Sequence, residues 1–257
     1  MARRIKKSVK KKFMIFIFII LLAIGLFLGA EYLEYQILTN MDRDLIINEK
    51  QEYYTARDFG FVDFKSSSDY DFNGIDDTTD ILNAAKKFAE NNPKYVSKYY
   101  ENGYPPDNEG VSTDVVWYSL KGAGFYLKDM IHYDITKLDK KNEYKIDIPD
   151  NNIDFRRTGN IELFLTRYGI KLTNNFNDFY EFMPGDIIIF DNGDHVAIIS
   201  DKRSENGIPY IIHNRGNGQK EKEEDFLETT DMVITGHFRF FYDEKVKNLL
   251  TEMTINE

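Results

Sequence analysis

Three histidines and one serine are the residues of this chain most suited to acyl-transfer chemistry. His195, His213 and His237 lie in or beside the short apolar runs of the C-terminal third, and Ser112 opens the segment STDVVWYSLKG. A helix dipole favours negative charge on a nucleophile at the helix N-terminus, and an imidazole on a facing strand can accept its proton. A third polar group orients that imidazole and fixes its tautomer. This arrangement makes Ser112 the candidate nucleophile, His195 the base and His213 the orienting residue.

Each of these residues also has a structural interpretation. Serine is a good helix N-cap, so Ser112 can serve only to begin a helix. His195 follows the turn DNGD and can be a surface residue, while His213 can be a hydrogen-bonded core histidine at a strand end. The aromatic segment GHFRF favours a structural hydrogen bond for His237 over catalysis, and we assign no role to His132.

A second group of polar residues forms the acidic loop DYDFNGIDDTTD at residues 69–80. It resembles the calcium loops of dockerins, which also end in Asp where an EF-hand has Glu, and Gly74 stands at the sixth place, where the chain turns sharply. The expected oxygen ligands are Asp69, Asp71, Asn73, the carbonyl of Ile75, Asp77 and Asp80. Such a Ca²⁺ is structural, and no catalytic cofactor is expected. The alternative is an acidic turn that caps the next helix without metal.

The elements that must position these residues follow from hydrophobic spacing and from turn residues. Helices are expected from Thr78 to a point before Pro93, from Ser112 to Gly122 or Gly124, and after Asn160 as an N-cap, with Gly169 as the stop. Strands are expected at 186–190, 195–200, 209–213 and 234–242, separated by the turns DNGD and SENG. Helices followed by an antiparallel sheet indicate an α+β domain.

Composition excludes several functional classes. The chain has 257 residues, a formal net charge of −10 and no cysteine. The absence of cysteine excludes disulfides, thiolate metal sites and a cysteine nucleophile. Seven of the first twelve residues are basic, so the remainder is even more acidic than the whole chain. This acidic balance argues against nucleic acid as a partner, because the phosphates would be repelled.

The N-terminal region predicts a membrane anchor. Residues 13–30 are uncharged and mostly apolar, about 27 Å of helix, and the basic segment 1–12 before them is expected to stay cytoplasmic. The alternative is a cleaved signal peptide. The spacing of Gly25 and Gly29 is compatible with a homodimer through the anchor. Beyond it we expect a stalk at 31–64, one extracytoplasmic domain at 65–242 that includes the acidic loop, and a C-terminal tail at 243–257.

Several ordered motifs resemble a known superfamily. GVSTDVVWYSLKGAGF, MPGDIIIFDNGDHVAIIS and YIIHN resemble the NlpC-type cell-wall peptidases, which are papain-like, and the chain is most similar to the branch called domain of unknown function 1287 through YYENGYPPDNEGVSTDVV, IDFRR and GHFRF. The resemblance implies a papain-like α+β fold and cleavage of an amide bond in peptidoglycan peptides. It also implies His195 as base, His213 as orienting residue and Tyr100 beside the nucleophile. Cell-wall peptide is the implied partner.

The chain departs from this family at the nucleophile. Ser112 stands where the family has cysteine, and a hydroxyl, unlike a thiol, cannot be held in its ionised form beside an imidazolium. Three interpretations remain open: a naturally inactive relative that binds ligand, a slow serine hydrolase, or an introduced Cys-to-Ser change that traps substrate. A rival from another class is a non-catalytic, calcium-stabilised surface module that binds another protein.

Three further residues are candidates for contacts with the substrate. Arg156 and Arg157 in IDFRR can form an internal ion pair, or an arginine can hold a substrate carboxylate through its planar fork. Asp114, in the helix that Ser112 begins, is the third candidate for substrate binding.

Overall fold

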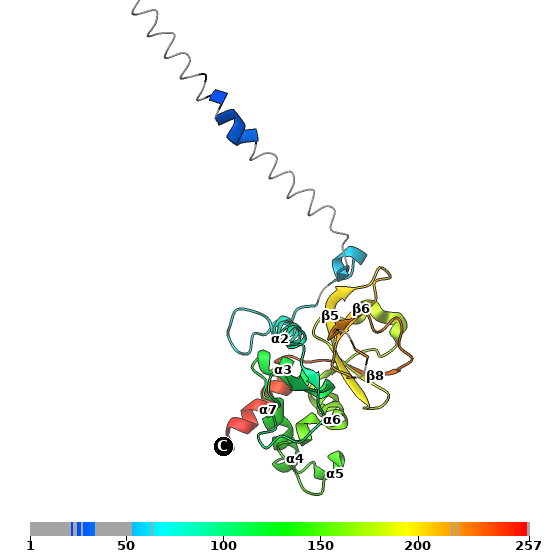
Figure 1. Cartoon of the computed structure of the whole chain (residues 1–257). Coiled ribbons are helices and arrows are strands. Elements are labelled where there is room, and N and C mark those ends of the chain that lie inside the picture. Colours follow the sequence, from blue (N-terminus) through cyan, green and yellow to red (C-terminus); the bar gives the residue numbers. More distant parts are fainter. Residues whose placement is uncertain are drawn as a thin grey trace, which may run out of the picture. The chain divides into compact units, whose positions relative to one another are not determined.

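The computed structural model describes residues 22, 25, 26, 28–33, 53–62, 64–216, 218–219 and 221–255 (Figure 1). The chain divides into two units, residues 1–52 and residues 53–257. In the first unit the described residues between 22 and 33 are helical and exposed. The second unit contains every other element described below.

Most of the predicted anchor lies outside the residues that the structure describes. Among the residues that the structure describes, no helix is long and apolar enough to cross a membrane. Segments 1–12 and 34–52, and most of 13–30, lie outside the described residues. The anchor, the basic segment and most of the stalk therefore stay predictions.

Two helices that pack against each other are the main elements in the N-terminal half of the second unit. Helix α2 spans Asp77–Asn91, begins where Asp76 accepts a hydrogen bond from the Thr79 backbone, and ends before Pro93. Helix α3 spans Ser112–Gly122. Both agree with the prediction. A side chain at Gly122 would collide with Ala84, so this glycine permits the close approach of α3 to α2.

The remaining helices are short. They are α4 (Leu127–Thr136), α5 (Lys141–Tyr144), α6 (Thr158–Tyr168) and α7 (Glu244–Ile255), with 3-10 turns η1 (Ala56–Phe59), η2 (Asp154–Arg156) and η3 (Phe176–Glu181). The prediction of Asn160 as an N-cap was wrong, because α6 begins three residues earlier than that cap implies, with Arg157 as its N-cap. Asn160 lies inside the helix, where its side chain donates to the carbonyl of Asp154 at 2.8 Å. Gly169 follows the last helical residue, as predicted.

A six-stranded antiparallel sheet forms the C-terminal half, in the order β3-β8-β4-β5-β6-β7. Its strands are β3 (Ile170–Lys171), β4 (Ile187–Phe190), β5 (His195–Arg203), β6 (Pro209–Ile212), β7 (Glu223–Glu224) and β8 (Ile234–Arg239). A separate parallel pair joins β1 (Lys94–Tyr95) to β2 (Glu109–Gly110). The α+β class with a C-terminal antiparallel sheet is as predicted.

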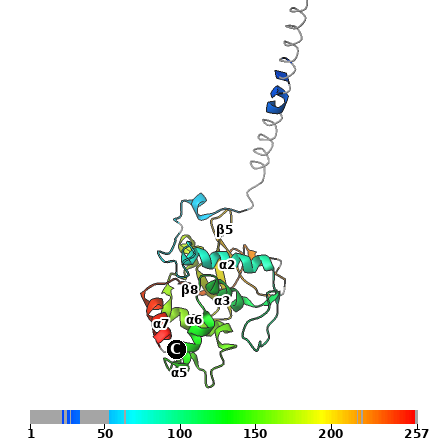
Figure 2. The ribbon, with the colours of Figure 1, turned by 90° about the vertical axis from the view of Figure 1, so that its left-hand side faces the viewer.

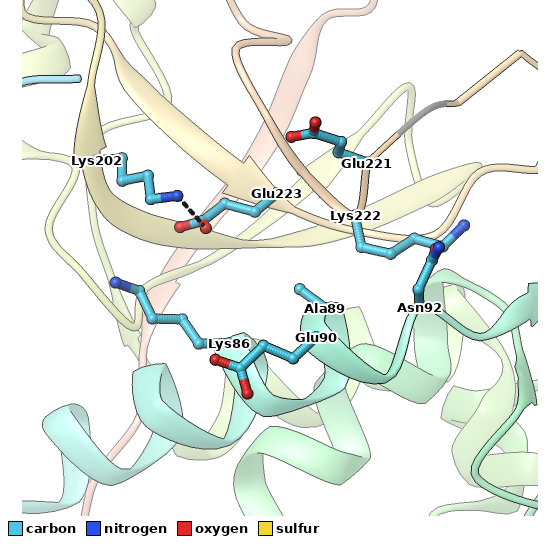
Figure 3. A pocket seen from close by; sticks show the side chains of 8 residues that line it. All are labelled: Lys86, Ala89, Glu90, Asn92, Lys202, Glu221, Lys222 and Glu223. Atoms are coloured by element: carbon cyan, nitrogen blue, oxygen red, sulfur yellow. Dashed lines mark ion pairs between the residues drawn. The ribbon is translucent and has the colours of Figure 1, made fainter. Parts of the chain in front are cut away.

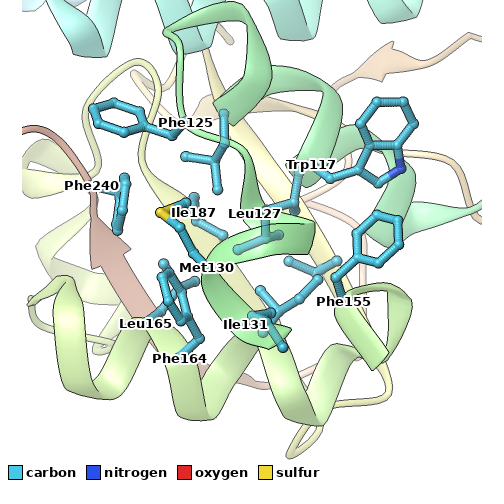
Figure 4. Close-up of a cluster of buried hydrophobic side chains, with 14 of the residues drawn as sticks. Trp117, Phe125, Leu127, Met130, Ile131, Phe155, Phe164, Leu165, Ile187 and Phe240 are labelled. Atoms are coloured by element: carbon cyan, nitrogen blue, oxygen red, sulfur yellow. The ribbon is translucent and has the colours of Figure 1, made fainter. Parts of the chain in front are cut away.

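The sheet is covered on both faces, which explains its continuous apolar strands. Alternate residues of β4 and β5, such as Ile187 and Val196, join the larger cluster formed with the helices, part of which Figure 4 shows. The residues between them, such as Ile188 and Ala197, join a smaller cluster with Phe226 on the opposite face. Helices α2 and α3 both pack against β5, and Figure 2 shows them crossing in front of it.

The boundaries of the domain differ from the prediction. Tyr54 pairs with Arg203 of β5, and the ring of Phe61 lies 6.2 Å from that of Phe179, so the packed unit begins near residue 53 and not at residue 65. At the other end, the described residues of the predicted tail, 243–255, belong to the packed unit. They contain α7, which packs against α4 and buries Val246 and Leu249 in the larger cluster.

Candidate active site

The two predicted histidines meet at the junction of β5 and β6. His195 is the first residue of β5, and His213 directly follows the last residue of β6, its antiparallel neighbour. Nε2 of His195 lies 2.7 Å from Nδ1 of His213, a hydrogen-bond distance. Both side chains are buried, with exposed fractions of 7% and 0%. The sheet register therefore produces the pair that the sequence predicted.

A carboxylate extends this pair on the side of His213. Oε1 of Glu224, in β7, lies 2.8 Å from Nε2 of His213, and the guanidinium Nε of Arg215 lies 3.5 Å from the same oxygen. Sequence reasoning missed both Glu224 and Arg215. The run EKEE contains three glutamates, and only the pairing of Ile211 with Glu224 across β6 and β7 shows which of them is placed beside His213.

Burial keeps both imidazoles neutral. It lowers the pKa of His195 to about 3, and the nearby His213 and Arg215 act in the same direction. Burial also lowers the pKa of His213, although the hydrogen bond and charge of Glu224 oppose this. Burial raises the pKa of Glu224, but the hydrogen bond from His213 and the charge of Arg215 outweigh it and leave that pKa below its usual value. At neutral pH the chain of groups is thus imidazole, imidazole and carboxylate.

Ser112 is the first residue of α3, with Val111 as the N-cap, so it is not the capping serine of the structural interpretation. It is 8% exposed, and in the part of the chain that the structure describes it forms no hydrogen bond with His195 or His213. Each histidine is next in sequence to a residue of the larger, helix-facing cluster, Val196 or Ile212. The histidine rings instead contact Phe190 and Phe226 of the smaller cluster. The structure therefore joins the histidines to each other but not to Ser112 directly.

Asn214 connects the histidine pair to the segment that precedes Ser112. Its buried side-chain amide donates to the carbonyl oxygen of Gly110 at 3.0 Å and to that of Pro93 at 3.2 Å. Lys222 donates to the Asn214 amide oxygen at 3.0 Å. The residue after His213 is thus bound to the backbone two positions before Ser112, which places the end of β6 next to the beginning of α3.

Asp114 and Arg156 form a buried internal ion pair. Nε and Nη2 of Arg156 donate to the two carboxylate oxygens of Asp114 at 2.7 and 2.9 Å. The same carboxylate accepts from the Val111 backbone and from the indole of Trp117, both at 2.7 Å. Of the two predicted alternatives for the arginine motif, Arg156 takes the ion pair, because its fork already binds a carboxylate of the protein.

Tyr100 and Arg157 occupy different environments. The Tyr100 ring lies 4.8 Å from the guanidinium of Arg156, and its hydroxyl donates to Glu109 at 2.8 Å. Burial, followed by the hydrogen bond to Glu109, raises the pKa of Tyr100 to about 12, so the phenol stays protonated. Arg157 has a side chain that is 58% exposed and lies 4.0 Å from Asp154, which leaves its guanidinium accessible to a ligand.

The acidic loop brings most of its predicted ligands together. The Asn73 backbone donates to Asp69 and Asp71, and its side-chain amide donates to Asp71 and Asp80 at 3.1 and 3.0 Å. Gly74 has a φ of +92°, the sharp turn that the loop requires. Burial and the neighbouring carboxylates raise the pKa of Asp80. Hydrogen bonds from Asn73 therefore link Asp69, Asp71 and Asp80 to one another.

Asp77 lies apart from this group. Its carboxylate accepts hydrogen bonds from the Tyr70 backbone, the Ser68 hydroxyl and the Tyr242 backbone, at 2.7, 2.6 and 2.8 Å. It fastens the loop to the segment after β8. Among the described residues, no group of three or more His, Asp or Glu side chains has the geometry of a metal site. The loop thus differs from the predicted Ca²⁺ site at Asp77, whose carboxylate is already occupied by hydrogen bonds from the protein.

The other histidines lie outside the site. His237 is fully buried, its Nδ1 lies 2.7 Å from the carbonyl oxygen of Thr173, and its Nε2 lies 3.0 Å from a carboxylate oxygen of Asp186. Arg239 donates to both oxygens of that carboxylate, at 2.7 and 2.8 Å. His237 is therefore a structural residue, as its sequence context favoured. Nδ1 of His132 is buried without a hydrogen-bond partner in the described structure.

A cavity of about 440 Å³ lies between α2 and the β7 edge of the sheet (Figure 3). It is lined by Lys86, Ala89, Glu90, Asn92, Lys202, Glu221, Lys222 and Glu223. Lys202 and Glu223 form an ion pair at 2.8 Å across its upper wall. Lys222, which donates to Asn214, joins this cavity to the junction beside Ser112. The lining of the cavity carries both positive and negative side chains, so its charge does not indicate whether an anion or a cation would bind there.

Comparisons with known proteins give one family and one relative. Residues 82–240, which include α3, the histidine pair and Glu224, match the family described as Domain of unknown function (DUF1287). The chain is also 35% identical over 154 residues to Uncharacterized protein YijF of Escherichia coli (strain K12). This similarity covers 58% of the present chain and 73% of that protein.

Proposed function

We propose, since the chain belongs to the family described as Domain of unknown function (DUF1287), that it carries a site of the amide-hydrolase type which engages cell-wall peptide. The observation that carries the proposal is the 2.7 Å contact between His195 and His213. An oriented, neutral imidazole is what a general base requires. The resemblance of the surrounding motifs to NlpC-type peptidases supports peptide amides as the substrate class.

In the proposed reaction, Ser112 holds the position of the nucleophile. Its oxygen attacks the amide carbonyl carbon while its proton passes to Nδ1 of His195. The C–N bond then breaks as that proton moves to the departing amine, which leaves an ester on Ser112. A water molecule, deprotonated by the same imidazole, cleaves the ester and restores the hydroxyl. The positive end of the α3 dipole favours the negative charge that develops beside Ser112.

The serine makes binding the dominant activity in this proposal. A thiolate can form in advance beside an imidazolium, whereas a serine must lose its proton during the attack itself. The pKa of His195, about 3, makes it a weak proton acceptor before substrate binds. We therefore propose that the wild-type chain binds wall peptide and turns it over slowly or not at all.

Presentation at the cell surface is part of the same proposal. A single membrane helix at residues 13–30, with residues 1–12 in the cytoplasm, would hold the domain on the outer side. Protease added to intact spheroplasts should then digest the folded domain and spare the N-terminal segment. Protection of the domain until the membrane is opened would contradict this location.

The test of function compares the full chain, purified in mild detergent, with Ser112→Cys and Ser112→Ala. Each protein is incubated with purified peptidoglycan, and new amine ends are counted together with bound wall fragments. We expect binding by all three proteins and release of amines at a rate at least tenfold above wild type only for Ser112→Cys, because a thiol can be activated by His195.

The matched control is Ser119→Cys, which makes the same exchange at a fully buried position of the same helix. This control should behave like the wild type. If neither the wild type nor Ser112→Cys binds or cleaves peptidoglycan while both stay folded, the proposed function is wrong.

A further inference from the structure

We propose that Glu224 is a positioning residue of this site, which holds His213 and His195 in the tautomers that leave Nδ1 of His195 free to accept a proton. The inference rests on the proposed function for its catalytic meaning. The tautomers themselves are a property of the folded chain and can be measured without substrate.

The directions of the two hydrogen bonds follow from the chemistry of the groups. An ionised carboxylate only accepts hydrogen bonds, so Nε2 of His213 must carry the proton in its 2.8 Å contact with Glu224. A neutral imidazole has one donor and one acceptor nitrogen, which leaves Nδ1 of His213 as an acceptor. The 2.7 Å contact with His195 then requires a proton on Nε2 of His195. Nδ1 of His195 is left with its lone pair.

The charges around the two histidines favour a single arrangement of protons on their rings. Arg215 lies 3.5 Å from the accepting oxygen of Glu224, and its guanidinium lies 5.0 Å from the centre of the Phe226 ring, so a fixed cation keeps the carboxylate ionised. Arg215 also lowers the pKa of both histidines, and Lys222 lowers that of His213. With these cations on one side and the Phe190 ring beside His195, a doubly protonated imidazole is disfavoured.

Each member of the chain of groups comes from a different strand or strand end. His195 begins β5, His213 follows β6, and Glu224 lies in β7, so the sheet register determines their distances. The backbone N–H of His213 donates to the carbonyl of Lys222 at 2.9 Å, which holds β6 and β7 together at this point. Without a carboxylate at position 224, nothing in the described structure would make Nε2 of His213 the protonated nitrogen.

The experiment is nitrogen NMR of the full chain labelled with ¹⁵N-histidine, in mild detergent at pH 7. The chain has four histidines, and His195→Gln and His213→Gln assign the two rings of interest. In the wild type we expect both rings to be neutral, protonated at Nε2 and unprotonated at Nδ1. A proton on Nδ1 of either His195 or His213 would overturn the inference.

Two substitutions test the role of the carboxylate. In Glu224→Ala we expect the ring nitrogens of His213 and His195 to shift toward the averaged values of exchanging tautomers, and Glu224→Asp should restore part of the wild-type pattern. Glu221→Ala removes the same charge from an exposed residue nearby and should leave both rings unchanged. Backbone amide spectra show whether each variant folds. Unchanged ring signals in folded Glu224→Ala would overturn the inference.

The outcomes separate the two proposals. Wild-type tautomers as expected, together with no peptidoglycan binding or cleavage, would support Glu224 and reject the proposed function. If Ser112→Cys cleaves peptidoglycan and adding Glu224→Ala does not slow it, the proposed function is supported and the positioning role of Glu224 is rejected. We expect instead that adding Glu224→Ala to Ser112→Cys lowers kcat by about 10² to 10⁴ with little change in KM, as for the loss of a residue that orients a catalytic base.

Discussion

Nε2 of His195 and Nδ1 of His213 lie 2.7 Å apart, although 18 residues separate them along the chain. The hairpin of β5 and β6 brings them together, and both residues are buried. An imidazole pair buried in this way is costly to protonate. The stability of the domain should therefore depend on pH in a way that identifies the pair.

Acidification should destabilise the domain through His195. In the unfolded chain this histidine titrates at its ordinary value of 6.5, whereas in the folded chain its pKa is about 3. The unfolded state thus binds more protons below pH 6.5, and the stabilising contribution, complete above that pH, is lost as the pH falls toward 3. From pH 7 to pH 5 the loss from His195 is about 2 kcal/mol. Urea unfolding at both pH values measures it.

The variant His195→Gln provides the comparison, because it lacks the titrating ring. The drop in unfolding free energy between pH 7 and pH 5 should be smaller in this variant by that amount, whatever its stability at pH 7. Equal drops in the two proteins would show that His195 is not buried in its neutral form.

The two arginines of IDFRR should differ strongly in their effect on stability. Arg156→Ala leaves the carboxylate of Asp114 buried without its partner, and we expect a loss of about 3–5 kcal/mol. Arg157→Ala, one residue away, removes a side chain that is 58% exposed, and its effect should stay within about 0.5 kcal/mol. Chemical denaturation can be followed through the fluorescence of Trp117, the single tryptophan, whose indole donates to Asp114.

Because Arg157 is exposed, its loss can still weaken the binding of wall fragments. A binding defect in Arg157→Ala at unchanged stability would assign the substrate-carboxylate role to this residue. If Arg157→Ala were as destabilising as Arg156→Ala, loss of the buried ion pair between Arg156 and Asp114 would not be the cause of the instability.

The acidic loop stays a prediction that calcium titration can test. We expect Ca²⁺ to bind the full chain with a Kd of about 10⁻⁴ to 10⁻³ M, because the last ligand is a short Asp and the loop lacks a free carboxylate at Asp77. Asp71→Ala should abolish the heat of binding in calorimetry and the rise in Tm with added Ca²⁺. Equal affinity in Asp71→Ala and the wild type would remove the proposed site.

Asp77→Ala is the matched variant within the same loop. Its carboxylate accepts three hydrogen bonds from the protein, so its loss should lower the Tm even without Ca²⁺. Binding of Ca²⁺ should persist in this variant. The two aspartates therefore separate metal binding from packing.

The positions of the main elements followed from the sequence because the signals are local. Helix α2 has apolar residues at three-to-four spacing and ends before Pro93, and β4 and β5 are apolar runs separated by DNGD. The α+β class followed from the order of these elements. The pairing of His195 with His213 was also predictable, since a hairpin with a short turn places consecutive strands side by side.

Contacts between distant segments were decided only by the tertiary structure. Arg156 meets Asp114 across 42 residues of sequence, and Glu224 belongs to a strand of two residues whose register no local signal reveals. The same holds for α7, whose Val246 and Leu249 become core residues only because α4 is there to cover them. Side-chain spacing along the chain determines which face an element buries, but the partner on that face depends on how all elements pack together. For that reason the sequence alone predicted the histidine pair, while the carboxylate that orients it appeared only in the folded chain.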